Sequence, residues 1–252
     1  MRIAILTHGS RAYVPSLVEI LLVQGISASD ITVFWNKCNS RTAKRFATRA
    51  EAAGCLVRRS SENIPVGAAY NRMLSDGPLD IPTLRLDDDC IPLPGAIATI
   101  ASFSQRVRAA VVGGGLLNED GSIQSNGGIC TKHKAWPVEL ETVRSRRVYY
   151  PWVSGAAMLL MPQALQSLMF NEDYPIWFED IDYCFQAWEY GLRVAMCKQS
   201  KFIHMSKGLS VDDPQIKRSL RIFMQRWSHH SEIRMPCEND QVRRAVNDFR
   251  SG

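Results

Sequence analysis

Short apolar runs alternate with segments of helical spacing along the first part of the chain. Residues 2–7 form one apolar run, helical spacing follows as far as Gly25, and residues 31–35 form a second apolar run. A polar helix is predicted over about 40–53, and Cys55 begins a third short run. Strands that alternate with helices pair in parallel and carry the helices on the faces of the sheet. The pattern therefore predicts an α/β fold: a Rossmann-like, mostly parallel sheet flanked by helices.

The alternation continues through the rest of the chain. The further predicted elements are helices over about 67–75, from Pro162, from about Glu179 to Gly191 and over about 213–228, and strands over 82–86, 110–117, 153–161, 193–196 and 201–204. Residues 130–150 have many charges and weak periodicity, so we expect a mobile loop there. The absence of an internal repeat, low-complexity tract or linker favours one domain with a C-terminal extension.

Composition excludes several classes of protein. With 46% hydrophobic and 22% charged residues in 252, the chain is neither disordered throughout, collagen-like nor a coiled coil. No run approaches the ~20 apolar residues of a membrane span, and the N-terminal residues lack a cleavage-site pattern, so we expect a soluble, cytoplasmic protein. The seven cysteines are scattered without C-x-x-C spacing, which favours neither disulfides nor a zinc site.

The net charge of +5 is concentrated towards the C-terminus. Residues 1–197 contain 19 Lys and Arg against 19 Asp and Glu, whereas residues 198–252 contain 11 against 6. Such a segment can attract nucleic acid, anionic lipid or a phosphorylated substrate, but its most common meaning is a solvated face. Charge alone therefore does not define the function.

Three adjacent carboxylates, Asp87, Asp88 and Asp89, end one of the predicted strands. Adjacent carboxylates repel one another and are costly to desolvate, so a protein that gathers them at the carboxyl edge of a sheet commonly offsets their charge with a cation. One interpretation is Mg²⁺ or Mn²⁺, held by one or two carboxylates together with phosphate oxygens of a substrate. The other is a solvated acidic turn, because aspartate favours turns. The triplet alone leaves both open.

A second acidic segment, from Trp177 to Asp182, places Glu179 and Asp180 at the start of a predicted helix. Acidic residues complement the helix dipole there whatever their function. The same dipole keeps a carboxylate ionised near neutral pH, as a general base for a sugar hydroxyl requires. His204, at the end of a predicted strand, also has two interpretations: a structural histidine, or a ligand.

The order of the segments adds information that no single motif contains. In chain order they are Ile5-Leu6-Thr7, Gly67 through Asn71-Arg72, Leu86-Asp87-Asp88-Asp89, Gly113 to Gly128 with Asp120-Gly121-Ser122-Ile123-Gln124 inside it, Val153-Ser154-Gly155-Ala156-Ala157-Met158-Leu159, Phe178-Glu179-Asp180-Ile181-Asp182-Tyr183-Cys184-Phe185 and Phe202-Ile203-His204. From Ile3 to about Trp227, the sequence resembles the inverting glycosyltransferases of the GT-A fold in family 2, most closely their rhamnosyltransferase-like branch. The resemblance implies a GT-A domain over 1–228, with a C-terminal helical extension, and a basic tail over 229–252.

The resemblance also implies roles for single residues. Asp87 and Asp89 match the D-x-D motif and would face Mn²⁺ or Mg²⁺, directly or through water, with His204 completing the coordination. Asp180 matches the general base of the family's E-D motif. The other implied contacts are those of Thr7, Arg72 and Asp88 with the nucleotide or the donor sugar, and those of Trp177, Glu179 and Gly155 with the sugar or acceptor pocket. Family members usually have an acidic residue after the second strand to hold the nucleotide base, where this sequence has Asn36, which could still hydrogen-bond a pyrimidine.

The activity implied by the resemblance is transfer of a sugar from a nucleoside-diphosphate-sugar donor to a hydroxyl of a glycan or lipid-linked acceptor. The family inverts the anomeric centre by direct displacement, as in polysaccharide biosynthesis. We interpret the basic C-terminal segment as a contact for a membrane surface or for a second copy of the chain, and we do not expect nucleic acid as a partner.

Two other functions remain open. A sugar-phosphate nucleotidyltransferase also combines an α/β sheet with a carboxylate-bound metal. It generally needs a glycine-rich basic loop after the first strand, and the segment from Thr7 to Arg11 has too few glycine and basic residues to match such a loop well. A non-catalytic carbohydrate- or nucleic-acid-binding module is supported only by the basic segment and by Phe223 and Trp227. The helical spacing of these two aromatic residues is more typical of a core.

Overall fold

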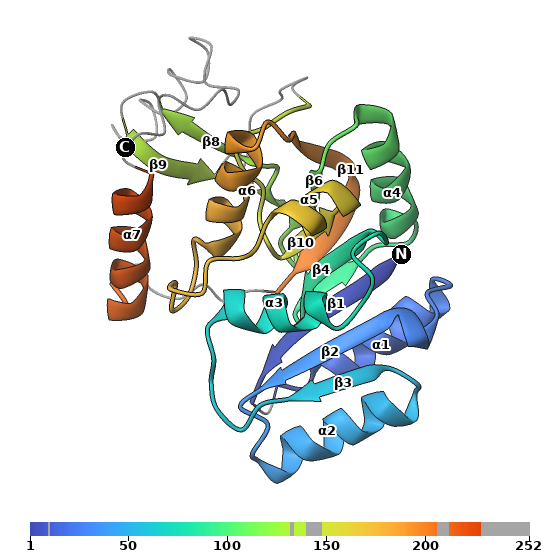
Figure 1. The fold of residues 1–252 in the computed structure, drawn as a ribbon. Helices are drawn as coiled ribbons and strands as arrows, with labels where there is room; N and C mark the ends of the chain where they lie inside the picture. The colour runs from blue at the N-terminus through green and yellow to red at the C-terminus, as the bar shows by residue number, and fades with distance from the viewer. Residues whose placement is uncertain (10, 132–133, 140–147, 206–211, 228–252) are drawn as a thin grey trace.

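The computed structural model describes residues 1–9, 11–131, 134–139, 148–205 and 212–227 (Figure 1). The strands are β1 (Arg2–His8), β2 (Ile31–Asn36), β3 (Leu56–Arg59), β4 (Thr83–Asp87), β5 (Cys90–Pro92), β6 (Val111–Leu117), β7 (Ile123–Ser125), β8 (Gly128–Thr131), β9 (Lys134–Glu139), β10 (Ala157–Leu160) and β11 (Val194–His204). The helices are α1 (Tyr13–Val23), the 3₁₀ turn η1 (Ala28–Asp30), α2 (Arg41–Ala52), α3 (Val66–Ser75), α4 (Ala96–Val107), α5 (Pro162–Ser167), α6 (Glu179–Glu189) and α7 (Pro214–Arg226). The predicted basic tail, 229–252, lies outside the described residues.

Nine of the strands in the described part of the chain form one sheet, in the order β3-β2-β1-β4-β10-β6-β11-β5 with β7 paired to β6. β1, β2, β3, β4, β6 and β11 run in one direction, and β5, β7 and β10 run in the other. Parallel neighbours need a crossover connection, which α1, α2 and α3 supply between β1, β2, β3 and β4. The predicted sheet, mostly parallel and flanked by helices, is confirmed.

Helices cover both faces of the sheet (Figure 1), and each face has its own apolar core. On one face, α3, α5, α6 and α7 bury large aromatic residues such as Tyr70, Phe185 and Trp227. On the other, α1, α2 and α4 bury smaller aliphatic residues such as Leu17 and Ile100. Because both faces are covered, the edge to which the carboxyl ends of β1, β4 and β6 point is where polar side chains can gather.

Three local predictions were wrong. The loop expected over 130–150 contains β9 and the end of β8, which pair antiparallel; Pro137 and the flanking charges hide the strand pattern there. The strand expected over 153–161 is regular only as β10 (Ala157–Leu160). The two expected pieces after Gly191 are one strand, β11, interrupted by a register shift between Cys197 and Lys201.

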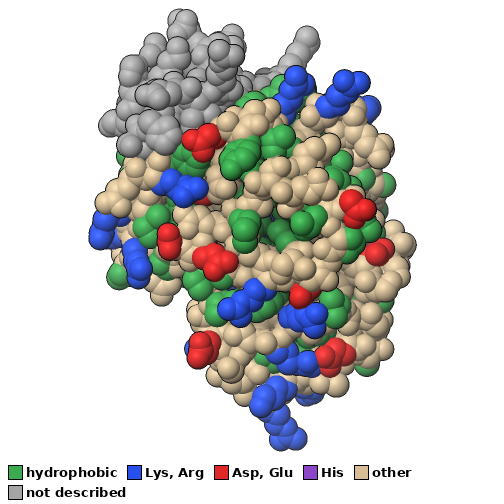
Figure 2. Space-filling model, in the orientation of Figure 1, with side chains coloured by type: hydrophobic (Ala, Val, Ile, Leu, Met, Phe, Trp, Pro, Cys, Tyr) green, Lys and Arg blue, Asp and Glu red, His purple; other side chains and the backbone are tan. Residues whose placement is uncertain are grey.

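No helix among the described residues is long and apolar enough to cross a bilayer. On the face of the molecule drawn in Figure 2, acidic and basic side chains are interspersed. A surface of mixed sign is what the balanced charge of residues 1–197 predicts.

Candidate active site

The aspartate triplet occupies the turn between β4 and β5. β4 is buried up to Leu86, and β5 begins at Cys90. β5 pairs antiparallel with the end of β11, so that His204 lies opposite Cys90. The backbone N–H of Met205 donates to the carbonyl of Asp89 at 3.0 Å and extends this pairing. The sheet thereby brings the end of β11 beside the triplet.

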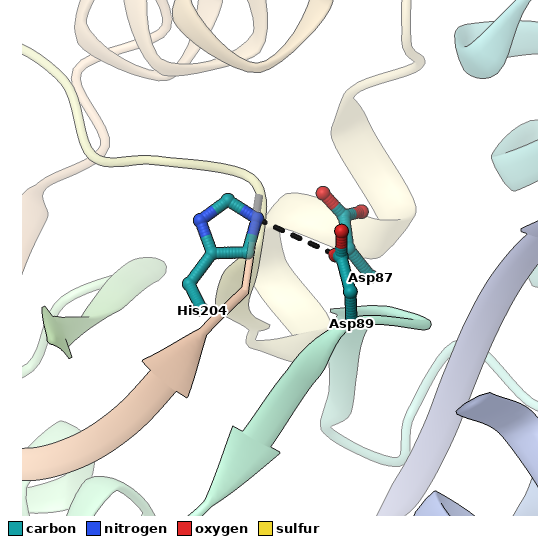
Figure 3. A group of neighbouring side chains, drawn as sticks. All are labelled: Asp87, Asp89 and His204. Atoms are coloured by element: carbon teal, nitrogen blue, oxygen red, sulfur yellow. Dashed lines mark ion pairs between the residues drawn. The ribbon is translucent and has the colours of Figure 1, made fainter. Parts of the chain in front are cut away.

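Asp87, Asp89 and His204 form a group suited to a metal ion (Figure 3). One ligand atom from each side chain lies within 4.8 Å of the other two. The imidazole Nε2 of His204 is 3.5 Å from Asp89 Oδ1. Two carboxylates and an imidazole are ligands that Mn²⁺ accepts. The structure thus brings together the three residues that the sequence resemblance implied as ligands.

Asp88, the middle residue of the triplet, is not part of this group. Its buried carboxylate accepts hydrogen bonds from Thr7 Oγ1 at 2.5 Å and from Arg11 Nη1 at 3.0 Å. Burial raises the pKa of Asp88 to about 6, against the opposing effect of these two donors. The same Arg11 nitrogen is 3.4 Å from Asp89 Oδ2. Arg11 therefore offsets part of the negative charge that the triplet accumulates.

Asp180 is the second residue of α6. Its partly buried carboxylate accepts hydrogen bonds from the backbone N–H groups of Gly155 at 2.7 Å and Ile181 at 2.8 Å. Burial, assisted by the charge of Glu179, raises the pKa of Asp180 to about 6. A carboxylate with this pKa is largely ionised at neutral pH and more basic than an ordinary aspartate, as a general base should be.

The other acidic residues in the first turn of α6 bind side chains. Glu179, expected in the sugar or acceptor pocket, pairs with the buried guanidinium of Arg85 at 2.7 Å. Asp182 accepts hydrogen bonds from Tyr174 Oη at 2.9 Å and Trp227 Nε1 at 2.7 Å. These contacts hold α6 to β4 and to the end of α7. Asp180, by contrast, is oriented by backbone N–H groups.

Arg85 connects the start of α6 with the metal-binding group. Its guanidinium is 3.9 Å from Asp87 Oδ1 and 4.3 Å from the centroid of the Tyr70 ring. Tyr70 Oη in turn donates to Asp87 Oδ1 at 3.3 Å. Gly155 gives the guanidinium its room, because a Cβ there would lie 2.4 Å from Arg85 Cζ. Gly155 thus serves Asp180 through its N–H and Arg85 through its lack of a side chain.

The two residues before α6 have a strained backbone. Trp177 has φ 60° and Phe178 has φ 69°, in the left-handed region that costs a non-glycine residue about 1–3 kcal/mol. Phe178 packs against Phe223, with 5.3 Å between the ring centroids, while Trp177 is 38% exposed. Strain that the surrounding structure maintains is typical of ligand-binding sites. The expected place of Trp177 in a sugar or acceptor wall stays a prediction.

The residues expected to bind the nucleotide lie along β1, β2 and α3. Both polar atoms of the Asn36 amide bind the backbone of Ile64, as donor to its carbonyl at 2.7 Å and as acceptor from its N–H at 3.0 Å. Arg72 is exposed on α3. The hydroxyl of Thr7 is bound to Asp88. Asn36 therefore has a structural task, and the contacts of all three residues with a nucleotide stay predictions.

Comparison with known proteins gives a result for structure but none for sequence. No protein-family model matches the chain, and no curated protein matches it. Among solved structures, GalNAc-T7 with UDP, GalNAc and Mn²⁺ has a TM-score of 0.69 and 11% identity over 92% of this chain. S. aureus TarS has a TM-score of 0.62 and 14% identity over 96% of this chain. Both are GT-A glycosyltransferases.

The protein has the GT-A fold. TarS residues 1–349 match with a TM-score of 0.61 and 15% identity over 96% of this chain and 68% of that one. The present chain spans 49% of the GalNAc-T7 chain and 41% of the longer TarS chain. In this GT-A fold, the β4–β5 turn supplies a D-x-D-like site from Asp87 and Asp89.

Sequence reasoning missed three polar residues beside the aspartate triplet. Arg85 had a visible signal, because a charged residue inside an otherwise apolar strand is rarely buried without a partner. Arg11 lies in the loop after β1, where sequence reasoning considered it only in weighing whether that loop resembles the basic loop of a nucleotidyltransferase. Tyr70 had no signal, since an aromatic residue in an amphipathic helix is ordinarily core. Its contact with Asp87 depends on how α3 packs on β4.

Proposed function

We propose that the protein is a metal-dependent inverting glycosyltransferase that moves a sugar from a nucleoside-diphosphate-sugar donor to a hydroxyl of a glycan or lipid-linked acceptor. The observation that carries the proposal is the convergence of Asp87, Asp89 and His204 at the edge of a GT-A sheet. A structural neighbour crystallised with UDP, GalNAc and Mn²⁺ supports it. The proposed transferred sugar is a hexose or rhamnose.

The donor set of the metal-binding group fits Mn²⁺ or Mg²⁺, which prefer carboxylate ligands and leave positions for substrate phosphates. Asp87, Asp89 and His204 would hold the ion. When bound, it would supply positive charge for the diphosphate leaving group. Burial acts to raise the pKa of Asp89, but the pKa is lowered overall, in part by the charge of Arg11, so the carboxylate is ionised as a metal ligand should be.

Asp180 is proposed as the general base. Its carboxylate takes the proton from the acceptor hydroxyl while that oxygen bonds to the anomeric carbon. The bond from the anomeric carbon to the diphosphate oxygen breaks with its electron pair, so the products are the glycoside and a nucleoside diphosphate. One displacement from the opposite face inverts the anomeric centre. The N–H groups of Gly155 and Ile181 keep both carboxylate oxygens oriented for this task.

The remaining roles belong to the same proposal. Trp177 would form part of the wall around the sugar or acceptor, and Arg72 is exposed where α3 would meet a nucleotide. Thr7 and Asp88, bound to each other, would shape the loop after β1 that faces the donor. The basic segment 198–252 would bring the protein to an anionic acceptor or membrane surface, and residues 228–252 of it lie outside the described part.

A thermal-shift panel of nucleoside diphosphates and nucleotide-sugars, with and without Mn²⁺, tests the donor class. A ligand that binds the native state raises the melting temperature by mass action. We expect at least one nucleoside diphosphate to stabilise the wild type only with Mn²⁺, and to lose that effect in Asp89→Ala. If no nucleotide stabilises the protein with the metal, the proposal fails.

Product analysis separates the proposal from its rivals. A glycosyltransferase without acceptor releases nucleoside diphosphate slowly from its donor, whereas a sugar-phosphate nucleotidyltransferase releases pyrophosphate from a nucleoside triphosphate. A binding module does neither. Release of pyrophosphate, or the absence of any donor turnover with an acceptor library, would exclude the proposed reaction.

A further inference from the structure

A chain of polar side chains runs from the turn after β6 to the metal-binding group. Its members are Asp120, Ser122, Asn118, Gln124 and His204. Ser122 Oγ is 2.6 Å from Asp120 Oδ1, and Asn118 Nδ2 is 2.9 Å from Ser122 Oγ. Gln124 Nε2 is 3.1 Å from Asn118 Oδ1, and Gln124 Oε1 is 2.6 Å from His204 Nδ1. Exposed side chains of the turn are thus linked to a residue proposed to bind the metal.

The charge of Asp120, at the first position of this hydrogen-bonded series, determines the direction of every hydrogen bond in the series. Hydrogen bonds from the hydroxyl and the backbone N–H of Ser122 lower the pKa of Asp120, so its carboxylate is ionised and only accepts. Ser122 therefore donates to Asp120 and accepts from the amide nitrogen of Asn118. The Asn118 oxygen then accepts from Gln124 Nε2, which leaves Gln124 Oε1 as the acceptor for His204.

A second contact determines the same direction independently. Gln124 Nε2 is also 3.2 Å from the backbone carbonyl oxygen of His204, and a carbonyl oxygen cannot donate. The amide of Gln124 must therefore turn its nitrogen towards that carbonyl and its oxygen towards the imidazole. His204 Nδ1 faces an oxygen that only accepts, so Nδ1 carries the proton.

We infer that Gln124 is a positioning residue that holds neutral His204 in the Nδ1–H tautomer and so directs its unprotonated Nε2 to the metal. Nε2 is the imidazole nitrogen on the side of Asp89, 3.5 Å from its Oδ1. Histidines that bind metals commonly donate their other N–H to such a partner, which sets the ring orientation. The inference rests on the proposed metal site. It assigns a role to the segment 118–124, which has no role in the proposed reaction.

NMR of the metal-free protein tests the tautomer without any activity measurement. Protein labelled with ¹⁵N-histidine is examined at alkaline pH, and the signals of His204 are assigned by their loss in His204→Asn. We expect the neutral ring to carry its proton on Nδ1 in the wild type and in Gln124→Glu, which keeps an acceptor at this place. In Gln124→Met, of similar size, the Nε2–H form should become populated. A wild-type His204 with its proton on Nε2 would overturn the inference.

Binding of Mn²⁺ alone, followed by the EPR signal of the free ion, gives a second readout. Loss of such an outer partner typically weakens metal binding by about 10–100-fold, which is the loss we expect for Gln124→Met. Glu119→Gln is the matched control, because Glu119 is exposed in the same turn and outside the hydrogen-bonded chain. Wild-type affinity in Gln124→Met would refute the role of Gln124. If the wild type itself binds no Mn²⁺, the proposed metal site fails, while the NMR result still decides the tautomer.

Discussion

Two opposing influences meet on the carboxylate of Asp180. Burial raises its pKa, whereas the N–H groups of Gly155 and Ile181 favour the ionised form. The sequence shows Asp180 as an acid at a helix start beside an aromatic residue, a pattern that by itself leaves a capping role open; the role of general base came from the family resemblance. The sequence was not sufficient to predict the raised pKa, which results from burial of the carboxylate in the folded chain. The chemistry of this residue therefore comes from the fold.

Asp180→Asn is expected to lower kcat by about 10²–10⁴-fold, because an amide cannot take the proton of the acceptor hydroxyl. Donor binding should persist, since none of the three proposed metal ligands changes. The measurements are steady-state release of nucleoside diphosphate and the thermal shift produced by donor with Mn²⁺. Asp173→Asn, an exposed acid ahead of the same helix, is the control and should keep wild-type kcat. Unchanged turnover in Asp180→Asn would remove Asp180 from the mechanism.

The pKa of about 6 at Asp180 also predicts a pH profile. The base must be ionised, so kcat/KM should fall about tenfold per pH unit below the pKa and level off above it. Initial rates at subsaturating acceptor, with Mn²⁺ in excess at each pH, would measure this. A rate that stays constant to well below pH 6 would mean that a group other than Asp180 accepts the proton.

Gly155→Ala tests the contact between two parts of the site. The added Cβ would lie 2.4 Å from Arg85 Cζ, and the buried guanidinium has little space to move. We expect a loss of about 1–3 kcal/mol in the free energy of unfolding, typical of overpacking, together with reduced turnover. Urea denaturation followed by tryptophan fluorescence gives the stability. Ser154→Ala, the adjacent position, should change stability far less.

Among the elements, several with clear local patterns were predicted, whereas helix α4 and the short strand β5 were not. β1, α2 and α6 followed from periodicity and helix stops. β5 was missed because Pro92 and Pro94 interrupt its sequence, although Pro92 is tolerated at the edge of the sheet. Yet β5 is the element that sets His204 opposite Cys90. The metal-binding group thus depends on a strand of three residues that local patterns do not reveal.

The junction between α6 and α7 gives a prediction for these elements. Trp227, 1% exposed at the end of α7, donates its indole N–H to Asp182 of α6 at 2.7 Å. Trp227→Phe removes that donor from a buried carboxylate, so we expect a loss of about 1–3 kcal/mol in the free energy of unfolding. Met224→Ala, on the exposed side of α7, is the control and should lose much less. Equal stability of Trp227→Phe and wild type would show that the hydrogen bond from the Trp227 indole does not help to hold α7 against α6.

The arrangement of the whole sheet explains why the site forms where it does. β10 lies antiparallel between β4 and β6, so it begins at the edge where β4 ends. Asp87 N–H donates to the carbonyl of Ala156 at 3.1 Å, which sets the residues before β10 beside the triplet. Gly155 can therefore reach Asp180 and Arg85 at once. The sequence predicted a mostly parallel sheet, but a reversed strand at its centre follows from tertiary pairing and had no local signal.

A base whose ionisation is costly should also affect the stability of the whole protein. The pKa of Asp180 is about 6 in the folded chain and near the ordinary value of about 3.9 when unfolded, so the folded state binds more protons between these values. The free energy of unfolding therefore decreases as pH rises through this range, and Asp180 destabilises the protein above it.

Asp180→Asn removes this cost. In metal-free protein, we expect the variant to melt at a higher temperature than the wild type near pH 8 and the difference to narrow near pH 5, where the wild-type carboxyl is protonated on folding. Calorimetry at the two pH values measures this difference in melting temperature. For Asp173→Asn, the difference from the wild type should be the same at both pH values. A variant less stable than the wild type near pH 8 would mean that the hydrogen bonds from Gly155 and Ile181 outweigh the cost of burying the charge. Catalytic competence at Asp180 would then carry no penalty in stability.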